Sequence, residues 1–229
     1  MERYGIGNFR RLIDFVRDVV LGFRISRSNT RVGTIVFGTK PYLLFGFNSY
    51  TNNGAVFNRL NKGVSYPKSG SRIGRALLMA QKQLFRKNPR RSRVTRVVVV
   101  ITDGSSMDDV AAPSNALKSR GVRIYCVGVG RYINGRQLDI MASPPRKNHI
   151  FTADWTHLGV VVNELRNAIC LGKMSSRFYK PGRIWQIVFP CTFIKKTCIY
   201  RNLVEPFCVL FFFPWNLTAV GSITTCIRF

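Results

Sequence analysis

One stretch of the sequence decides the fold: Val97–Val98–Val99–Val100–Ile101–Thr102–Asp103–Gly104–Ser105–Ser106–Met107–Asp108–Asp109–Val110. Its first six residues are β-branched, which predicts a strand buried on both faces of a parallel sheet. Asp108 and Asp109 then fit the start of a helix, because acidic side chains favour helix N-termini. Ligands of open parallel sheets bind beyond the carboxyl ends of the strands, so Asp103 stands where a binding site is expected.

Outward from this strand, the apolar residues alternate between helical and strand periods. On the N-terminal side they predict a helix over 9–23, strands over 32–37 and 42–47 that can form a hairpin, and helices over 52–60 and 73–84. On the C-terminal side they predict a helix over 111–119, a strand over 122–127, a short helix around 138, a short strand at 150–151 and a helix over 158–169. Strands alternating with helices predict an α/β fold of three layers with a doubly wound, mostly parallel sheet.

The composition describes a globular protein with an unusual charge. Hydrophobic residues make up 46% of the chain and charged residues 20%, which excludes a disordered protein. Lys and Arg number 36 against 10 Asp and Glu, a formal net charge of +26 that attracts polyanions. The alternative is that the charge reflects lineage composition or a partly non-native reading frame.

A cluster of basic residues crowds the connection before the strand at 97–102. Its members are Arg86, Lys87, Arg90, Arg91, Arg93 and Arg96. The cluster lies at the opposite end of the sheet from Asp103, and its charge makes it a candidate site for a polyanion such as a sulfated glycan. The alternative is a solvated loop. Nucleic acid is not favoured, because no aromatic side chains are interleaved with these arginines.

A second loop strengthens the signal at Asp103, because Ser69–Gly70–Ser71 offers hydroxyl groups at the mouth of another helix. With this loop in place, residues 8–171 resemble a von Willebrand factor A domain of the type found in matrilins, collagens and cnidarian matrix proteins. The matching segments follow the family's order and spacing: Asn8–Phe9 with its helix, 31–37, 69–77, 97–110, 122–130 and the closing helix that ends in Cys170.

The resemblance implies a degenerate metal site. In that family a divalent cation, usually magnesium, is held by an Asp-x-Ser-x-Ser loop after the first strand, a Thr in a second loop and an Asp in a third. Here Ser71 matches the second loop and keeps the hydroxyl, and Asp103 matches the third. The first loop falls on Met1–Gly5, where none of its ligands survives, and the first central strand would precede Met1. We therefore expect no cofactor, and Mg²⁺ only if a parent protein carries the missing strand.

The resemblance further implies a function. It points to a non-enzymatic protein-binding module of the extracellular matrix or cell adhesion type, secreted although no signal sequence opens the chain, with a matrix or cell-surface protein such as collagen as partner. Cys170 fits this reading, because matrix A domains often form a disulfide from this position to a cysteine before the first strand, here absent. The alternatives are an intracellular scaffold with the same fold, or a truncated product without stable function.

The sequence contains no motif that indicates catalysis. His149 and His157 lack metal-ligand spacing, and no nucleophile elbow, P-loop or dinucleotide-binding fingerprint is present. Cys126 lies in a predicted core strand and is expected to behave as a small hydrophobic residue.

The chain divides into a domain over residues 1–172 and a basic tail over 173–229 that is rich in Phe and Cys. We expect the tail to be poorly ordered and dispensable, and its longest apolar stretch, 207–215, is too short to span a bilayer. Loss of a central strand would leave unpaired backbone and apolar surface in the middle of the sheet. The protein should therefore be marginally stable, or borrow a strand from its tail, with 184–189 as the expected donor.

Overall fold

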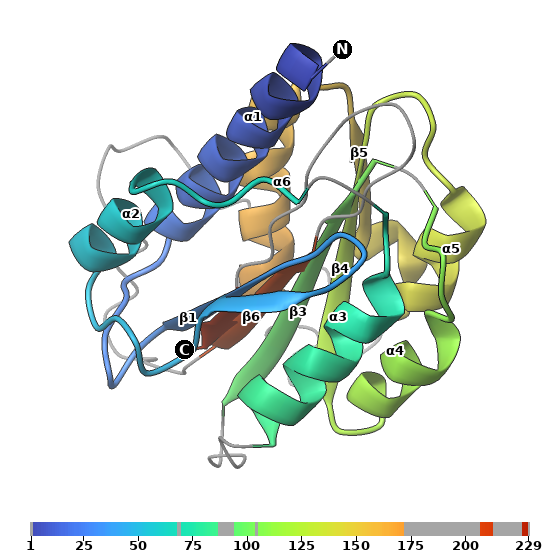
Figure 1. Ribbon diagram of the computed structural model, residues 1–229. Coiled ribbons are helices and arrows are strands. Elements are labelled where there is room, and N and C mark those ends of the chain that lie inside the picture. Colours follow the sequence, from blue (N-terminus) through green and yellow to red (C-terminus); the bar gives the residue numbers. More distant parts are fainter. Residues whose placement is uncertain are drawn as a thin grey trace, which may run out of the picture.

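The computed structural model describes residues 2–67, 70–86, 94–103, 105–171, 207–212 and 226–228. A seven-stranded sheet forms the middle layer, and helices cover both of its faces (Figure 1). The helices are α1 (Glu2–Leu21), α2 (Asn53–Asn61), α3 (Ile73–Met79), α4 (Ala111–Lys118), α5 (Gly135–Met141) and α6 (Leu158–Leu171), with a π-helix η1 (Ala80–Phe85) and a 3₁₀-helix η2 (Arg146–Asn148). The strands are β1 (Arg31–Val36), β2 (Tyr42–Phe45), β3 (Thr95–Thr102), β4 (Val122–Val129), β5 (Ile150–Ala153), β6 (Phe207–Phe212) and β7 (Cys226–Arg228).

The order of the strands is β2-β1-β6-β7-β3-β4-β5. Parallel pairing joins β3 to β4 and β4 to β5, and β1 and β2 form the expected antiparallel hairpin with a register shift after Thr34. On one face α1 packs against α2 and α6, and on the other α4 packs against α3 and α5. These pairings confirm the predicted three-layer α/β fold with its mostly parallel sheet.

A strand from the tail lies in the slot between β1 and β3. β6 runs parallel to both, with Val32 opposite Val209 on one side and Val100 opposite Phe212 on the other, and β7 pairs antiparallel with β6. Borrowing a strand was one of the two expected outcomes, but the strand is Phe207–Phe212, and the expected donor 184–189 lies outside the described residues. β6 and β7 thus belong to the sheet, although the sequence assigned them to a separate tail; the boundary at 172 stays a prediction.

The choice of β6 has a simple physical reason. Phe207–Cys–Val–Leu–Phe–Phe212 is a continuous apolar run, which is the composition of a strand covered on both faces, as in Val97–Ile101. Pro214 follows shortly after, and proline is disfavoured inside a central strand. This run is too short to span a membrane, but its length is typical of a buried strand.

Two predicted elements differ from those observed. α1 begins at Glu2 and not near Phe9, so residues 2–5 of the segment that the resemblance aligned with the family's first loop are helical. The predicted helix over 73–84 is an α-helix only to Met79 and continues as the π-helix η1.

The core fixes the position of β3. Val97 to Ile101 are fully buried, and the apolar stripe of α1, which includes Phe9, Val16 and Val19, is buried with them. Because β3 is packed on both faces, its carboxyl end, which Asp103 directly follows, is held in a fixed position. Among the described residues, no helix combines the length and the apolar character needed to cross a membrane.

Candidate functional site

The carboxyl edge of the sheet brings the second and third loops together. The backbone N–H of Met107 donates to the carbonyl of Ser71 at 2.7 Å, and the N–H of Ile73 donates to Ser106 Oγ at 2.9 Å. Ser71 and Asp103, which the sequence selected as remnants of a metal site, therefore belong to two loops that are tied to each other.

Asp108 is the main link between these loops. Its Oδ1 accepts from the N–H of Gly74 at 2.9 Å and from Ser106 Oγ at 2.6 Å, and its Oδ2 accepts from the N–H of Arg75 at 2.9 Å. Asp108 thus caps α3, whereas the sequence placed it at the start of the following helix. That start is capped by Asp109 alone, which accepts from the N–H groups of residues 111 and 112.

The close approach of the two loops requires glycine at position 74. A Cβ added there would lie 1.9 Å from the carbonyl oxygen of Asp109, a backbone atom that cannot move aside. Gly74 is the second glycine of the Ser-Gly-Ser-Arg-Ile-Gly segment, and only its place in the fold reveals this role.

A third loop, between β4 and α5, supports the same edge. Asn134 Nδ2 donates to Ser105 Oγ at 2.8 Å, and Gln137 accepts from the N–H of Ser106 at 2.6 Å while its Nε2 donates to the carbonyl of the same residue at 3.3 Å. The sequence offered no signal for Asn134 or Gln137, because their partners lie about 30 residues away along the chain.

Three polar atoms at this edge are buried without a hydrogen-bond partner. Among the described residues, four buried side-chain polar atoms have none: Thr34 Oγ1, Ser71 Oγ, Arg72 Nε and Asp103 Oδ1. All but the first belong to the second and third loops. Native proteins satisfy nearly all buried polar groups, so a group of unsatisfied atoms in one place indicates a site that a ligand, an ion or water completes.

The electrostatics of Asp103 follow from its burial. Removal from water raises the pKa of Asp103 to about 8 from an ordinary value of 3.8, and a backbone hydrogen bond offsets only part of this rise. The described neighbourhood therefore does not stabilise a negative charge at this position.

Two of the oxygen donors at this edge are of a kind that a divalent cation binds. Ser71 Oγ and Asp103 Oδ1 are buried acceptors without partners, as two ligands of a magnesium ion would be. Magnesium requires near-octahedral coordination by about six oxygens, however. Residues 2–5 of the segment aligned with the family's first loop lie in α1. Ser71 and Asp103 alone supply fewer oxygens than this coordination requires.

The edge also carries exposed apolar side chains. Tyr132 and Met107 are 76% and 69% exposed, the highest values among the large hydrophobic residues whose burial is described. Both lie on the loops just described, so an exposed aromatic and an exposed thioether flank the unsatisfied polar atoms.

The basic cluster at the opposite edge is only partly within the described residues. Arg86 is exposed after η1, and Lys87, Arg90, Arg91 and Arg93 lie outside the described part of the chain. Arg96 is only 8% exposed, and its guanidinium lies over the ring of Phe85 with 5.8 Å to the centroid. Arg96 therefore packs in the core and presents little charge to a polyanion.

Of the remaining residues that the sequence singled out, Cys126 and His149 pack in the interior and His157 lies on the surface. Cys126 is fully buried, as predicted, and burial raises the pKa of its thiol. His149 is buried against Tyr125 with 4.5 Å between ring centroids, and its Nδ1 lies 3.0 Å from the carbonyl oxygen of Pro145. His157 is exposed.

Comparison with known sequences identifies the family. The model of the von Willebrand factor type A domain matches residues 2–164, and the chain belongs to this family. Human vitrin is 35% identical over 150 residues, which cover 66% of this chain and 22% of vitrin. The mouse collagen alpha-4(VI) chain is 30% identical over 168 residues, 71% of this chain and 7% of the collagen chain. Human cochlin is 28% identical over 177 residues, 76% of this chain and 31% of cochlin.

Comparison with solved structures supports the fold. Proximal thread matrix protein 1 of the mussel byssus superposes with a TM-score of 0.65 at 24% identity, covering 71% of this chain and 41% of that protein. Another structure of the mussel protein has a zinc-occupied metal-ion-dependent adhesion motif (TM-score 0.64, 22% identity, 71% and 40% covered). Manganese-loaded TRAP of Plasmodium vivax superposes with a TM-score of 0.56 at 21% identity, covering 68% and 64%.

These relatives define the class of module. Vitrin, collagen VI and cochlin are extracellular matrix proteins, and the chain is a von Willebrand factor A domain similar to part of each. It spans less than a third of the length of each.

Proposed function

We propose that this chain is a non-enzymatic, secreted protein-binding module whose binding face is the carboxyl edge of the sheet. The observation that carries this is the gathering of unsatisfied polar atoms on Ser71, Arg72 and Asp103 beside the exposed side chains of Met107 and Tyr132. Exposed Tyr and Met are typical of protein interfaces, and buried polar atoms gain most from a partner that completes their hydrogen bonds. The matrix relatives support a matrix or cell-surface protein such as collagen as the partner.

The rigidity of the loops supports this role. Asp108 accepts from the hydroxyl of Ser106, Gln137 accepts from the N–H of Ser106, and Asn134 donates to the hydroxyl of Ser105, so the loop that carries Met107 is held in place. A preorganised surface loses less conformational entropy on binding than a mobile one.

Binding is tested by surface plasmon resonance on immobilised collagen and on a panel of purified matrix proteins. For the protein that is captured, Tyr132→Ala should weaken binding by roughly tenfold and Met107→Ala by roughly threefold to tenfold. Leu21→Ala is the matched control, because Leu21 is 49% exposed at the far end of α1. Equal losses for all three variants, or none, would place the interface elsewhere.

The metal site is proposed to be degenerate. Ser71 and Asp103 supply two donors, and the family's remaining ligands have no counterpart in residues 2–5. Isothermal titration with Mg²⁺ or Mn²⁺ should therefore show no binding tighter than about millimolar, against micromolar or better for dedicated cation sites. A micromolar dissociation constant that disappears in Asp103→Ala would refute this, and partner binding would then be repeated with and without EDTA.

A further inference from the structure

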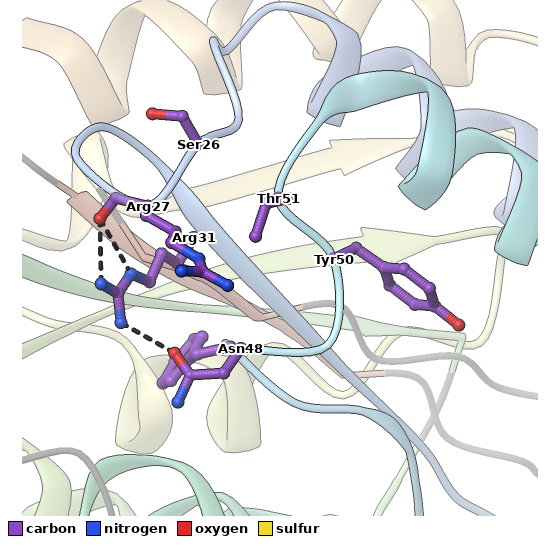
Figure 2. Close-up of a pocket in the computed structure, with 7 residues that line it drawn as sticks. Ser26, Arg27, Arg31, Asn48, Tyr50 and Thr51 are labelled. Carbon is purple, nitrogen blue, oxygen red and sulfur yellow. Dashed lines mark hydrogen bonds between the residues drawn. The ribbon is translucent and has the colours of Figure 1, made fainter.

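A pocket of about 340 Å³ opens near the amino edge of the sheet, away from the proposed protein-binding face. Three segments meet there: the turn after α1, the first residue of β1 and the loop between β2 and α2. Its lining residues are Ser26, Arg27, Arg31, Phe47, Asn48, Tyr50 and Thr51. Figure 2 shows Arg27, Arg31 and Asn48 on one side of this pocket, with Tyr50 and Thr51 across from them.

Arg31 is held in a fixed orientation. Its Nε and Nη2 donate to the carbonyl oxygen of Arg27 at 3.2 and 2.9 Å, and its Nη1 donates to Asn48 Oδ1 at 2.8 Å (Figure 2). These acceptors are a peptide carbonyl and a side-chain amide, which are both neutral. These contacts orient the guanidinium, and neither acceptor carries a charge.

The turn that carries Arg27 is also tied down. Ser26 and Thr30 are joined by a backbone hydrogen bond of 3.0 Å, and Ser26 Oγ accepts from the N–H of Asn29 at 2.9 Å. Asn53, at the start of α2, accepts from the N–H of Ile25 at 3.0 Å and donates to the carbonyl of Phe23 at 2.8 Å. The pocket is thus formed by segments that are fixed to one another before any ligand arrives.

The charge of the lining is positive. Two arginines contribute to it, Arg27 is exposed, and the lining contains neither Asp nor Glu. Arg24 adds a further exposed arginine on the same turn. A fixed guanidinium with a second one beside it matches an oxyanion better than any other common ligand group. The amide of Asn48 and the hydroxyls of Ser26 and Thr51 belong to the same lining and suit a polar sugar.

We propose that this pocket binds one sulfate-bearing sugar unit of a sulfated glycan, with Arg27 and Arg31 as the anion-binding residues. The volume is at the lower end of the range for small-molecule sites, which suits a single sugar and not a longer segment. The matrix relatives favour a glycan over nucleic acid as the polyanion. This pocket is separate from the basic cluster at Arg86, and the inference does not depend on the proposed protein-binding face.

The test measures binding of a heparin-derived tetrasaccharide to the full chain by isothermal titration at physiological salt. Arg27→Ala should weaken binding by about fivefold to tenfold, because one charge-assisted contact is lost. Arg131→Ala removes the same charge from an exposed position at the carboxyl edge and should change binding less than twofold. Equal losses in both variants would show a diffuse effect of net charge and would overturn the proposal.

A second variant tests the geometry. Arg31→Lys keeps the charge but loses the planar fork, and it should weaken tetrasaccharide binding at least threefold while the melting temperature confirms folding. Unchanged binding in a folded Arg31→Lys protein would overturn the assignment. Arg86→Ala measures the basic cluster independently, and a loss there alone, with Arg27→Ala unaffected, would also overturn it.

The ligand class is tested with the wild-type chain. De-sulfated tetrasaccharide should bind at least tenfold more weakly than the sulfated form, and inorganic sulfate in millimolar excess should compete. Equal affinity for de-sulfated sugar, or for a DNA duplex of matched charge, would reject a sulfate-specific pocket. Tyr132→Ala should leave tetrasaccharide binding unchanged, which separates this test from that of the protein-binding face.

Discussion

The two edges of the sheet carry opposite chemistry on the same scaffold. At the carboxyl edge, Asp103, Asp108 and Asp109 follow β3, and one of these carboxyl groups has a buried oxygen without a partner. At the amino edge, Arg27 and Arg31 line a pocket whose lining contains no acid, and the exposed Arg24 belongs to the same turn as Arg27.

The architecture accounts for this difference. In a doubly wound fold the helices begin near the carboxyl ends of the strands and end near the amino ends. Helix dipoles therefore favour acidic side chains at the first edge and basic ones at the second. In this chain Asp108 caps α3 and Asp109 caps α4, so acids stand at the starts of these two helices although the net charge of the chain is +26.

The largest effect is expected from the strand that runs between the two edges. A chain ending at residue 172 lacks β6, so β1 and β3 lose their shared neighbour, and the free energy of unfolding should fall by roughly 5 kcal/mol or more. This is the opposite of the dispensable tail expected from the sequence. Urea unfolding of the full and truncated chains measures it, with a full-length chain whose residues 207–212 are replaced by Gly and Ser as control. Equal midpoints for all three proteins would show that the sheet tolerates the open slot.

Asp103→Asn should give the next largest effect, and it depends on pH. Because burial raises the pKa of Asp103 from 3.8 to about 8, the group's contribution to stability is complete below about pH 4 and is lost as the pH rises through about 8. Relative to the Asn variant, the wild type should lose roughly 3–5 kcal/mol between these limits. Urea unfolding of both proteins from pH 4 to pH 9 tests this. If the two curves of unfolding free energy against pH stay parallel, the pKa of Asp103 is not raised in the folded protein.

Asp108→Ala should have a smaller effect on stability. Comparing it with Asp109→Ala shows whether a hydrogen bond between two loops contributes more than a cap within one segment. The variant loses acceptors for the N–H groups of Gly74 and Arg75, and its free energy of unfolding should fall by about 2–3 kcal/mol. Asp109→Ala removes a local cap of α4 and should cost about 1 kcal/mol. Denaturant unfolding of both proteins provides the comparison. A larger loss for Asp109 would show that the loops do not depend on Asp108.

The sequence predicted the elements whose patterns are local. The β-branched run at 97–102 is a buried strand and the apolar stripes of α1 and α6 face the core, although α1 begins seven residues before the predicted helix. Burial on both faces of a strand or along one face of a helix produces a period that one segment contains by itself. The α/β fold and the place of Asp103 at a strand end followed from these patterns, and the family followed from the resemblance of the motifs.

Contacts between segments that are distant in the sequence could not be predicted from such local patterns. The sequence predicts Asp108 at the start of the helix that follows it, yet in the structure it caps α3, which lies more than thirty residues earlier in the chain. Arg96 reads as a member of a basic cluster, yet it packs over Phe85 because its strand lies in the core.

The sequence by itself therefore determined the order of strands and helices along the chain up to α6 and, through the resemblance of its motifs, the family. Only the tertiary structure decided that Phe207–Phe212 takes the slot between β1 and β3, that Gly74 must lack a side chain, and that Arg27 and Arg31 line one pocket. The physical reason is that a period or a helix signal is contained in one segment. Strand pairing, close backbone approach and pocket formation instead depend on which distant segments meet.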